Sequence, residues 1–197
     1  MESIPKINCR YCIDNITYTR LSLKGSTRIQ VVLHRFSAPE RTVLNTVKIT
    51  LTSIAPRRTR SKSEATDRLL AEYIDRAAHY VPCDSQVFES ESAFLDWLDK
   101  NPSRTPAKAI LLDSRGQQYT SEEFAGHLGR LRDDGAQRLV LGIGPADGWS
   151  ASARQRANLL FSLGRITLPH QLARVVLAEQ VYRALTILAG HPYHSGH

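Results

Sequence analysis

The chain has 197 residues, of which 42% are hydrophobic and 23% charged, so it is long enough for one ordinary globular domain with a substantial core. No apolar run reaches the ~18–20 residues of a membrane helix, and the first residues lack the apolar core of a signal peptide, so we expect a cytoplasmic protein without membrane contact. Twenty-six Lys and Arg against 19 Asp and Glu give a net charge of +7, a modest excess that fits an anionic partner such as RNA.

Residues 1–46 stand apart from the rest of the chain, because they show no clear core pattern. Cys9 and Cys12 form a CxxC pair, but a zinc site needs four ligands, and only the remote Cys83 and His34 could add to it. We therefore expect no metal site. We interpret residues 1–46 as an N-terminal extension, either a small appendage or a disordered segment. One hypothesis is that translation starts after it.

From residue 47 onward, apolar runs of strand type alternate with amphipathic helical patterns. The expected strands are 47–54, 85–89, 107–113, 138–143 and 163–168, and the expected helices are 63–79, 92–100, 120–134, 151–161 and 170–189. Ser63, Thr120 with Glu123, and Ser150 supply the N-terminal caps. This order predicts an α/β fold with a mainly parallel sheet flanked by helices.

The last helix has an expected apolar face with Leu172, Val175, Val176, Ala178, Leu185 and Leu188. Gly190 is expected to end the helix as a C′ residue, and Pro192 prevents the helix from continuing beyond it. The short tail that follows contains Tyr193 and His194. An aromatic residue, a proline and two histidines so close together favour a segment docked in a site.

Ligands of parallel sheets bind beyond the carboxyl ends of the strands. Three loops of this chain are candidates for that ligand site. They follow Asp113, follow Ile143, and surround residues 163–168. Gly144 and Gly148 in the second loop would let a backbone approach a ligand closely, although a plain turn explains them equally well. The loop matches neither a dinucleotide-binding nor a P-loop pattern, which counts against another small α/β enzyme with a nucleotide cofactor.

Six motifs in a fixed order are specific when taken together. They are Leu-Asp-x-x-Gly (111–116), Thr-Ser-Glu-Glu-Phe (120–124), Ile-Gly-x-x-x-Gly (143–148), Thr-Leu-Pro-His-Gln-Leu-Ala-Arg (167–174), Glu-Gln-Val-Tyr-Arg-Ala (179–184) and His-Pro-Tyr-His (191–194). The chain closely resembles the RlmH family of SPOUT-class RNA methyltransferases. The resemblance covers about residues 47–197, which we expect to form the methyltransferase domain.

The resemblance implies an enzyme that uses S-adenosyl-L-methionine to methylate N3 of pseudouridine 1915 in 23S ribosomal RNA, on assembled ribosomes. It also implies a homodimer and a trefoil knot in the C-terminal part of the sheet. By match to the family's motifs, the cofactor should contact Leu112, Gly144, Leu163, Gly164, Arg165, Ile166, Thr167 and Leu168. A different class of function stays open, a catalytically silent RNA- or ribosome-binding module that keeps the same fold.

The residue chemistry agrees with that assignment. Leu112, Ile166 and Leu168 could sandwich the adenine, although plain core packing also explains them. Arg174 could stabilise an anion that develops on the base or could form a structural salt bridge, with Glu179 as a candidate partner. Tyr193 or His194 could orient the base or relay its N3 proton, or the tail could merely close the pocket.

Two loops depart from the family's usual pattern. Pro145 follows Gly144 where relatives have a second glycine, so a backbone N–H donor is missing from the loop. A basic run of Arg57, Arg58, Arg60 and Lys62 follows the first strand, where relatives commonly have Gly-Lys. This run is either a solvated loop or a phosphate contact.

Overall fold

The computed structural model describes residues 47–56, 64–100, 105–191 and 193, and all structural statements concern these residues. Residues 1–46, with Cys9, Cys12 and His34, lie outside this part, as do the basic run at 57–62 and the Ser63 cap. In the described part the elements are β1 (Lys48–Ile54), α1 (Glu64–Ala78), β2 (Cys83–Phe88), α2 (Glu91–Lys100), β3 (Lys108–Gln117), α3 (Ser121–Asp133), β4 (Arg138–Ile143), α4 (Ala151–Arg156), β5 (Leu159–Phe161) and α5 (His170–Leu188).

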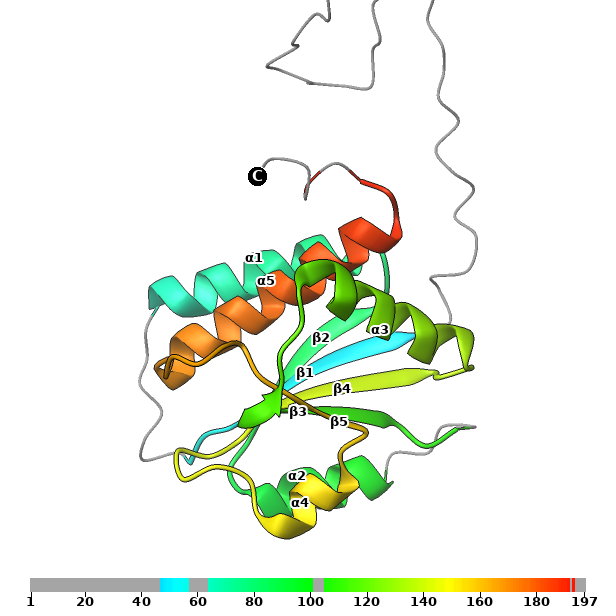
Figure 1. The fold of residues 1–197 in the computed structure, drawn as a ribbon. Coiled ribbons are helices and arrows are strands. Elements are labelled where there is room, and N and C mark those ends of the chain that lie inside the picture. Colours follow the sequence, from blue (N-terminus) through cyan, green and yellow to red (C-terminus); the bar gives the residue numbers. More distant parts are fainter. Residues whose placement is uncertain (1–46, 57–63, 101–104, 192, 194–197) are drawn as a thin grey trace, which may run out of the picture. The chain divides into compact units, whose positions relative to one another are not determined.

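The five described strands form one sheet in the order β2-β1-β4-β3-β5, and every neighbouring pair is parallel. Helices α1, α3 and α5 cover one face of the sheet, and α2 and α4 cover the other (Figure 1). Each face has its own apolar core, with Leu51, Ile110 and Leu141 on the first and Leu111, Val140 and Trp149 on the second. The predicted α/β fold with a parallel sheet is confirmed.

The predicted boundaries are wrong between residues 151 and 168. Helix α4 ends at Arg156 instead of 161, strand β5 lies at Leu159–Phe161, and residues 163–168 form no strand. Asn158 explains the difference. Its main-chain N–H donates to the Ala109 carbonyl at 2.7 Å, and its side-chain oxygen accepts from the Ala109 N–H at 2.9 Å. These two bonds stop the helix and start pairing with β3.

The predicted caps are confirmed where they are described. Thr120 and Glu123 form a reciprocal capping box on α3, and the Ser150 hydroxyl accepts from the Ala153 N–H on α4. Helix α5 begins at His170 after Pro169, and Gly190 follows it at φ +67°, the left-handed conformation that favours glycine. These local signals were strong enough to fix element ends from sequence.

The buried face of α5 agrees only in part with the predicted one. Ala178 and Leu185 are buried as predicted, whereas Leu172 is 46% exposed. The other buried residues of this face, which the prediction did not include, are Ala173, Leu177, Val181 and Ala184. Helix α5 packs beside both α1 and α3, as the contacts of Tyr182 with Tyr73 and of Gln180 with Ser121 show. Small residues such as Ala173 and Ala184 on the packed face let these helices approach closely.

Strand β3 contains a bulge beside Phe161, the last residue of β5. Leu112 and Gln117 both lie opposite Phe161, so residues 113–116 bulge out of the ladder. The Ser162 N–H donates to the Gln117 carbonyl at 2.9 Å, and a Cβ on Gly116 would stand 2.6 Å from the carbonyl carbon of Leu160. The segment after β5 then crosses the end of β3 on its way to α5 (Figure 1). Such a crossing is compatible with a knot, whose threading stays a prediction.

Candidate functional site

The strand register gathers three predicted cofactor segments at the carboxyl edge of the sheet. Leu112 pairs with Ile143 of β4 on one side and with Phe161 of β5 on the other. Gly144 follows Ile143, and the run 163–168 begins two residues beyond Phe161, so both leave the sheet beside Leu112. Residues more than 50 positions apart in sequence thus meet at one place, where parallel sheets bind ligands.

Gly144 lies directly on the Trp149 indole. A Cβ at position 144 would stand 3.0–3.1 Å from three atoms of that ring, which leaves no room for a side chain. Trp149 is 3% exposed, and its Nε1–H donates to the Leu112 carbonyl at 2.9 Å. The turn that carries it is closed by the Gly148 N–H, which donates to the Pro145 carbonyl at 2.9 Å. Sequence reasoning missed Trp149, although a large aromatic residue in a Gly-rich loop was a usable signal.

The run 163–168 divides into a packed part and an exposed part. Leu163 and Leu168 pack against the first core, as Leu112 does. Arg165, Ile166 and Thr167 are exposed, and Ile166 is 75% exposed. The turn before them is held by the Ser162 hydroxyl, which donates to the Gly164 carbonyl at 3.0 Å. An isoleucine displayed so fully beside a glycine-lined edge is a surface suited to an apolar ligand face.

His170 connects α5 to the same edge. Its ring lies beside the main-chain carbonyls of Ile54 and Gly144. Burial lowers the pKa of His170, the nearby Arg174 cation lowers it further, and the two carbonyls oppose that shift. Its Nε2 atom is buried and has no hydrogen-bond partner in the described part of the chain. His170 packs at the start of α5, and the helix has no side-chain cap.

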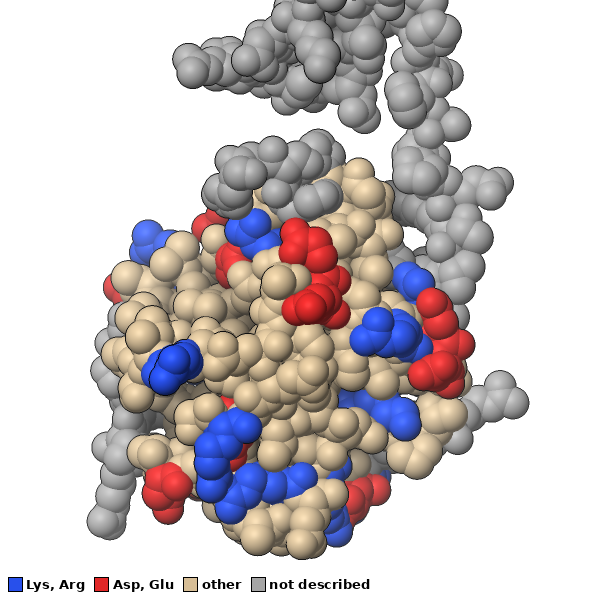
Figure 2. Space-filling model, viewed as in Figure 1, with Lys and Arg blue, Asp and Glu red and all other residues tan. Residues whose placement is uncertain are grey.

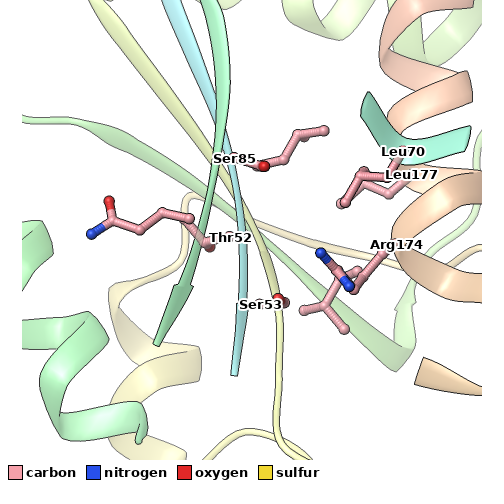
Figure 3. Close-up of a pocket in the computed structure, with 9 residues that line it drawn as sticks. Thr52, Ser53, Leu70, Ser85, Arg174 and Leu177 are labelled. Atoms are coloured by element: carbon pink, nitrogen blue, oxygen red, sulfur yellow. The ribbon is translucent and has the colours of Figure 1, made fainter. Parts of the chain in front are cut away.

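Arg174 lies one helical turn further along α5 and points toward the end of β1 (Figure 3). Its side chain is 15% exposed and forms an ion pair with Asp67 of α1 at 3.1 Å, while the same Nη1 lies 2.7 Å from the Gln171 oxygen. The candidate salt bridge exists, but its partner is Asp67, because Glu179 pairs with Arg183 at 2.7 Å. Arg174 also lines a cavity of about 10 Å³ with Ser53 and Ile143, room for one water at most.

Tyr193 lies well away from Gly144 within one chain. Its ring packs edge-on against Tyr182 at 4.8 Å between centroids, and Arg183 stands 5.0 Å from the ring centre. Tyr182 is twelve residues from His170, or about 18 Å along the helix at ~1.5 Å per residue. Burial, followed by the effects of Tyr73 and Glu179, raises the pKa of Tyr193. His194 lies outside the described residues.

No group of three His, Cys, Asp or Glu suited to a metal ion occurs among the described residues. Burial raises the pKa of the Cys83 thiol to about 12, so it is protonated at neutral pH and a poor metal ligand. Within the same residues, no helix combines the length and apolar character needed to cross a bilayer.

The parallel sheet, with its candidate site at the carboxyl edge, agrees with the family comparison. The family model described as "Predicted SPOUT methyltransferase" matches residues 47–194, and the chain belongs to this family. Among its relatives it is similar to the Ribosomal RNA large subunit methyltransferase H of Koribacter versatilis, with 47% identity over 70% of this chain and 94% of that protein. The protein of the same name from Brucella anthropi is 56% identical over 45% of this chain and 55% of its own length.

Solved structures give a weaker likeness. One is the SpoU methyltransferase AviRb from Streptomyces viridochromogenes in complex with AdoMet, at 14% identity and a TM-score of 0.45, covering 75% of this chain and 60% of that one.

Proposed function

We propose that the protein transfers a methyl group from S-adenosyl-L-methionine to N3 of pseudouridine 1915 in the 23S RNA of assembled ribosomes. The observation that supports this most is the meeting of Leu112, Gly144 and the run 163–168 at one carboxyl edge. Its relative from Koribacter versatilis, matched over 94% of its length, bears the name of a ribosomal RNA methyltransferase. A ribosomal substrate also makes the cytoplasm the expected compartment.

The residues at the edge fit the cofactor. Ile166 offers an exposed apolar surface for the adenine, whereas Leu112 and Leu168 are partly buried and support that surface from the core side. Gly144 lets the main chain pack directly on the Trp149 ring, which fixes the loop at this edge. The cofactor supplies an electrophilic methyl group on a sulfonium. The main-chain groups of the run 163–168 would hold it in line with the attacking nitrogen, and alignment is the chief demand of such a transfer.

Arg174 is the described residue best suited to the base. N3 of a uracil-type base loses its proton during methylation, so negative charge develops on the flanking carbonyls. Arg174 uses Nη1 for Asp67 and Gln171, and a guanidinium has further N–H donors. We propose that these donors bind the base carbonyls. His170 stays neutral at pH 7 because its pKa is lowered, so it adds no second cation beside the sulfonium.

The proposed roles of Tyr193 and His194 require a second copy of the chain. Tyr193 contacts the middle of α5 and lies about 18 Å along the helix from His170. We propose a homodimer in which the tail of one protomer orients the base or accepts its proton at the edge of the other. Sedimentation gives the oligomeric state, and a mixed dimer of tail-deleted and Gly144→Trp protomers tests the exchange. Activity in that mixed dimer supports it, and complete inactivity contradicts it.

Calorimetry with S-adenosyl-L-methionine and mass mapping of ribosomal RNA test the function itself. We expect cofactor binding by the full-length protein, and a pseudouridine that lacks its methyl group in a deletion strain. Absence of cofactor binding with retained RNA affinity would instead support a silent RNA-binding module. A fully methylated pseudouridine in the deletion strain would contradict the assigned substrate.

A further inference from the structure

A buried carboxylate one residue beyond Leu112 holds two arginines at the same edge of the sheet. The Asp113 side chain is 5% exposed. Its Oδ1 accepts from the Arg115 main-chain N–H at 2.9 Å and from Arg115 Nε at 3.1 Å, and its Oδ2 accepts from Arg115 Nη2 at 3.2 Å. Arg154 of α4 lies 3.5 Å from Oδ2 through Nη1. One anion and two cations leave this Asp113 cluster with one unit of positive charge.

The cluster presents arginine donors in a fixed orientation. Arg115 uses two of its five side-chain N–H groups on Asp113, which leaves three on a side chain that is 70% exposed. The Arg154 side chain is 29% exposed. The bidentate contact fixes the plane of the Arg115 guanidinium, so little side-chain entropy is lost when an anion binds to its outer edge. Asp113 is buried, so the two arginines also neutralise its charge, but the outward N–H groups of Arg115 take no part in that contact.

The cluster belongs to the surface next to the proposed cofactor edge. Adjacent residues of a strand point to opposite faces, so Asp113 points toward α4 while Leu112 packs against the other core. Lys and Arg side chains gather in a band on this side of the molecule, over α4 and the bent end of β3 (Figure 2). Arg156 adds a further cation in the last turn of α4, although it pairs with Asp99.

We propose that Arg115 and Arg154 bind backbone phosphates of the RNA beside the target nucleotide, an inference that rests on the proposed function. A base that enters the cofactor edge leaves its flanking phosphates at the surface, where planar guanidiniums bind them in a bidentate manner. Phosphate contacts of this kind fix the register of the RNA without reading its sequence. The cofactor's own carboxylate is the competing anion, and the experiment separates the two.

The test compares full-length Arg115→Gln and Arg154→Gln with Arg68→Gln. Arg68 is also an exposed arginine paired with a carboxylate, Glu64, but it lies on α1. Binding of a labelled RNA stem-loop is measured between 50 and 200 mM KCl, and cofactor binding is measured by calorimetry. We expect each cluster variant to weaken RNA binding roughly 5- to 10-fold and to reduce the salt slope by about 0.7–0.9, the loss of one phosphate contact. Cofactor affinity should stay unchanged.

Three results would overturn the proposal. They are an unchanged salt slope in both cluster variants, an equal loss in Arg68→Gln, or a loss of cofactor affinity that matches the loss of RNA affinity, which would assign the cluster to the cofactor carboxylate. Arg115→Lys provides a second check, because it keeps the charge and should restore the salt slope without restoring full affinity. If the wild-type protein binds RNA but no cofactor, the proposed function fails and the phosphate contacts are still tested.

Discussion

Replacing Trp149 by phenylalanine tests the architecture of the cofactor edge more directly than any other single change. The substitution keeps an aromatic ring in the second core, where Trp149 packs 5.3 Å from the Phe94 ring centre. It removes the Nε1–H that donates to the Leu112 carbonyl at 2.9 Å, and it removes the part of the ring beneath Gly144. Two predicted cofactor residues, Leu112 and Gly144, therefore lose support, and Gly142 of β4 loses a ring contact as well.

The size of the effect follows from those two losses. A buried carbonyl that loses its donor costs about 1–3 kcal/mol, and the smaller ring leaves a cavity that adds on the order of 1 kcal/mol. We expect a decrease of about 2–4 kcal/mol in the free energy of unfolding, a large share of the ~5–15 kcal/mol of a typical domain. At an m-value of about 2 kcal/mol per molar urea, the unfolding midpoint should fall by roughly 1–2 M.

The assay combines urea unfolding with calorimetry of cofactor binding, and Trp97→Phe is the matched control. Trp97 packs beside Phe88 and Phe94 in the same core but lies on α2, away from Gly144. Trp149→Phe should weaken cofactor binding about 3- to 10-fold where the folded protein persists, because Leu112 and Gly144 lose their support, whereas Trp97→Phe should lower stability alone. Equal cofactor affinities in the two variants would refute the reasoning.

Four further predictions address other parts of the site. Gly144→Trp should abolish cofactor binding, because even a Cβ would stand 3.0 Å from the Trp149 ring; normal affinity in calorimetry would contradict the assignment. Because the pKa of His170 is lowered in the folded state, the unfolded state binds more protons below pH ~6.5, so stability is lost as the pH falls through that value. His170→Asn should reduce this dependence in urea titrations at pH 5.5 and 7.5, with a remainder from His127, whose pKa burial also lowers. Thr120→Ala should lower the free energy of unfolding by about 1 kcal/mol through loss of the capping box, measured by denaturation, with Ser152→Ala as an exposed control. Deleting residues 193–197 should leave the domain folded by circular dichroism and remove methylation of ribosomes; full activity would show that the tail is dispensable.

Local chemistry made much of the fold predictable from the sequence. The capping box at Thr120 and the glycine after α5 have specific backbone requirements, so their positions in sequence fix where helices begin and end. The apolar runs at 107–113 and 138–143 predicted buried parallel strands, and both exist. The predicted boundaries were wrong at 151–168, where Asn158 makes two hydrogen bonds to Ala109, a residue 49 positions away. No local pattern encodes such a partner.

The candidate site also depends on partners distant in sequence, which local patterns do not encode. Motif order assigned Leu112, Gly144 and the run 163–168 to one ligand, and strand register then accounts physically for their meeting. Trp149 and the Asp113 cluster escaped sequence reasoning, because their importance depends on neighbours that only the folded sheet supplies. Tyr193 illustrates the opposite case. Its motif assigns it to the reaction, while its contacts with Tyr182 and Arg183 hold it about 18 Å along α5 from His170. A residue with a proposed role in chemistry and a place far from the reacting edge is reconciled most simply by a second protomer, which makes the mixed-dimer experiment decisive for the mechanism.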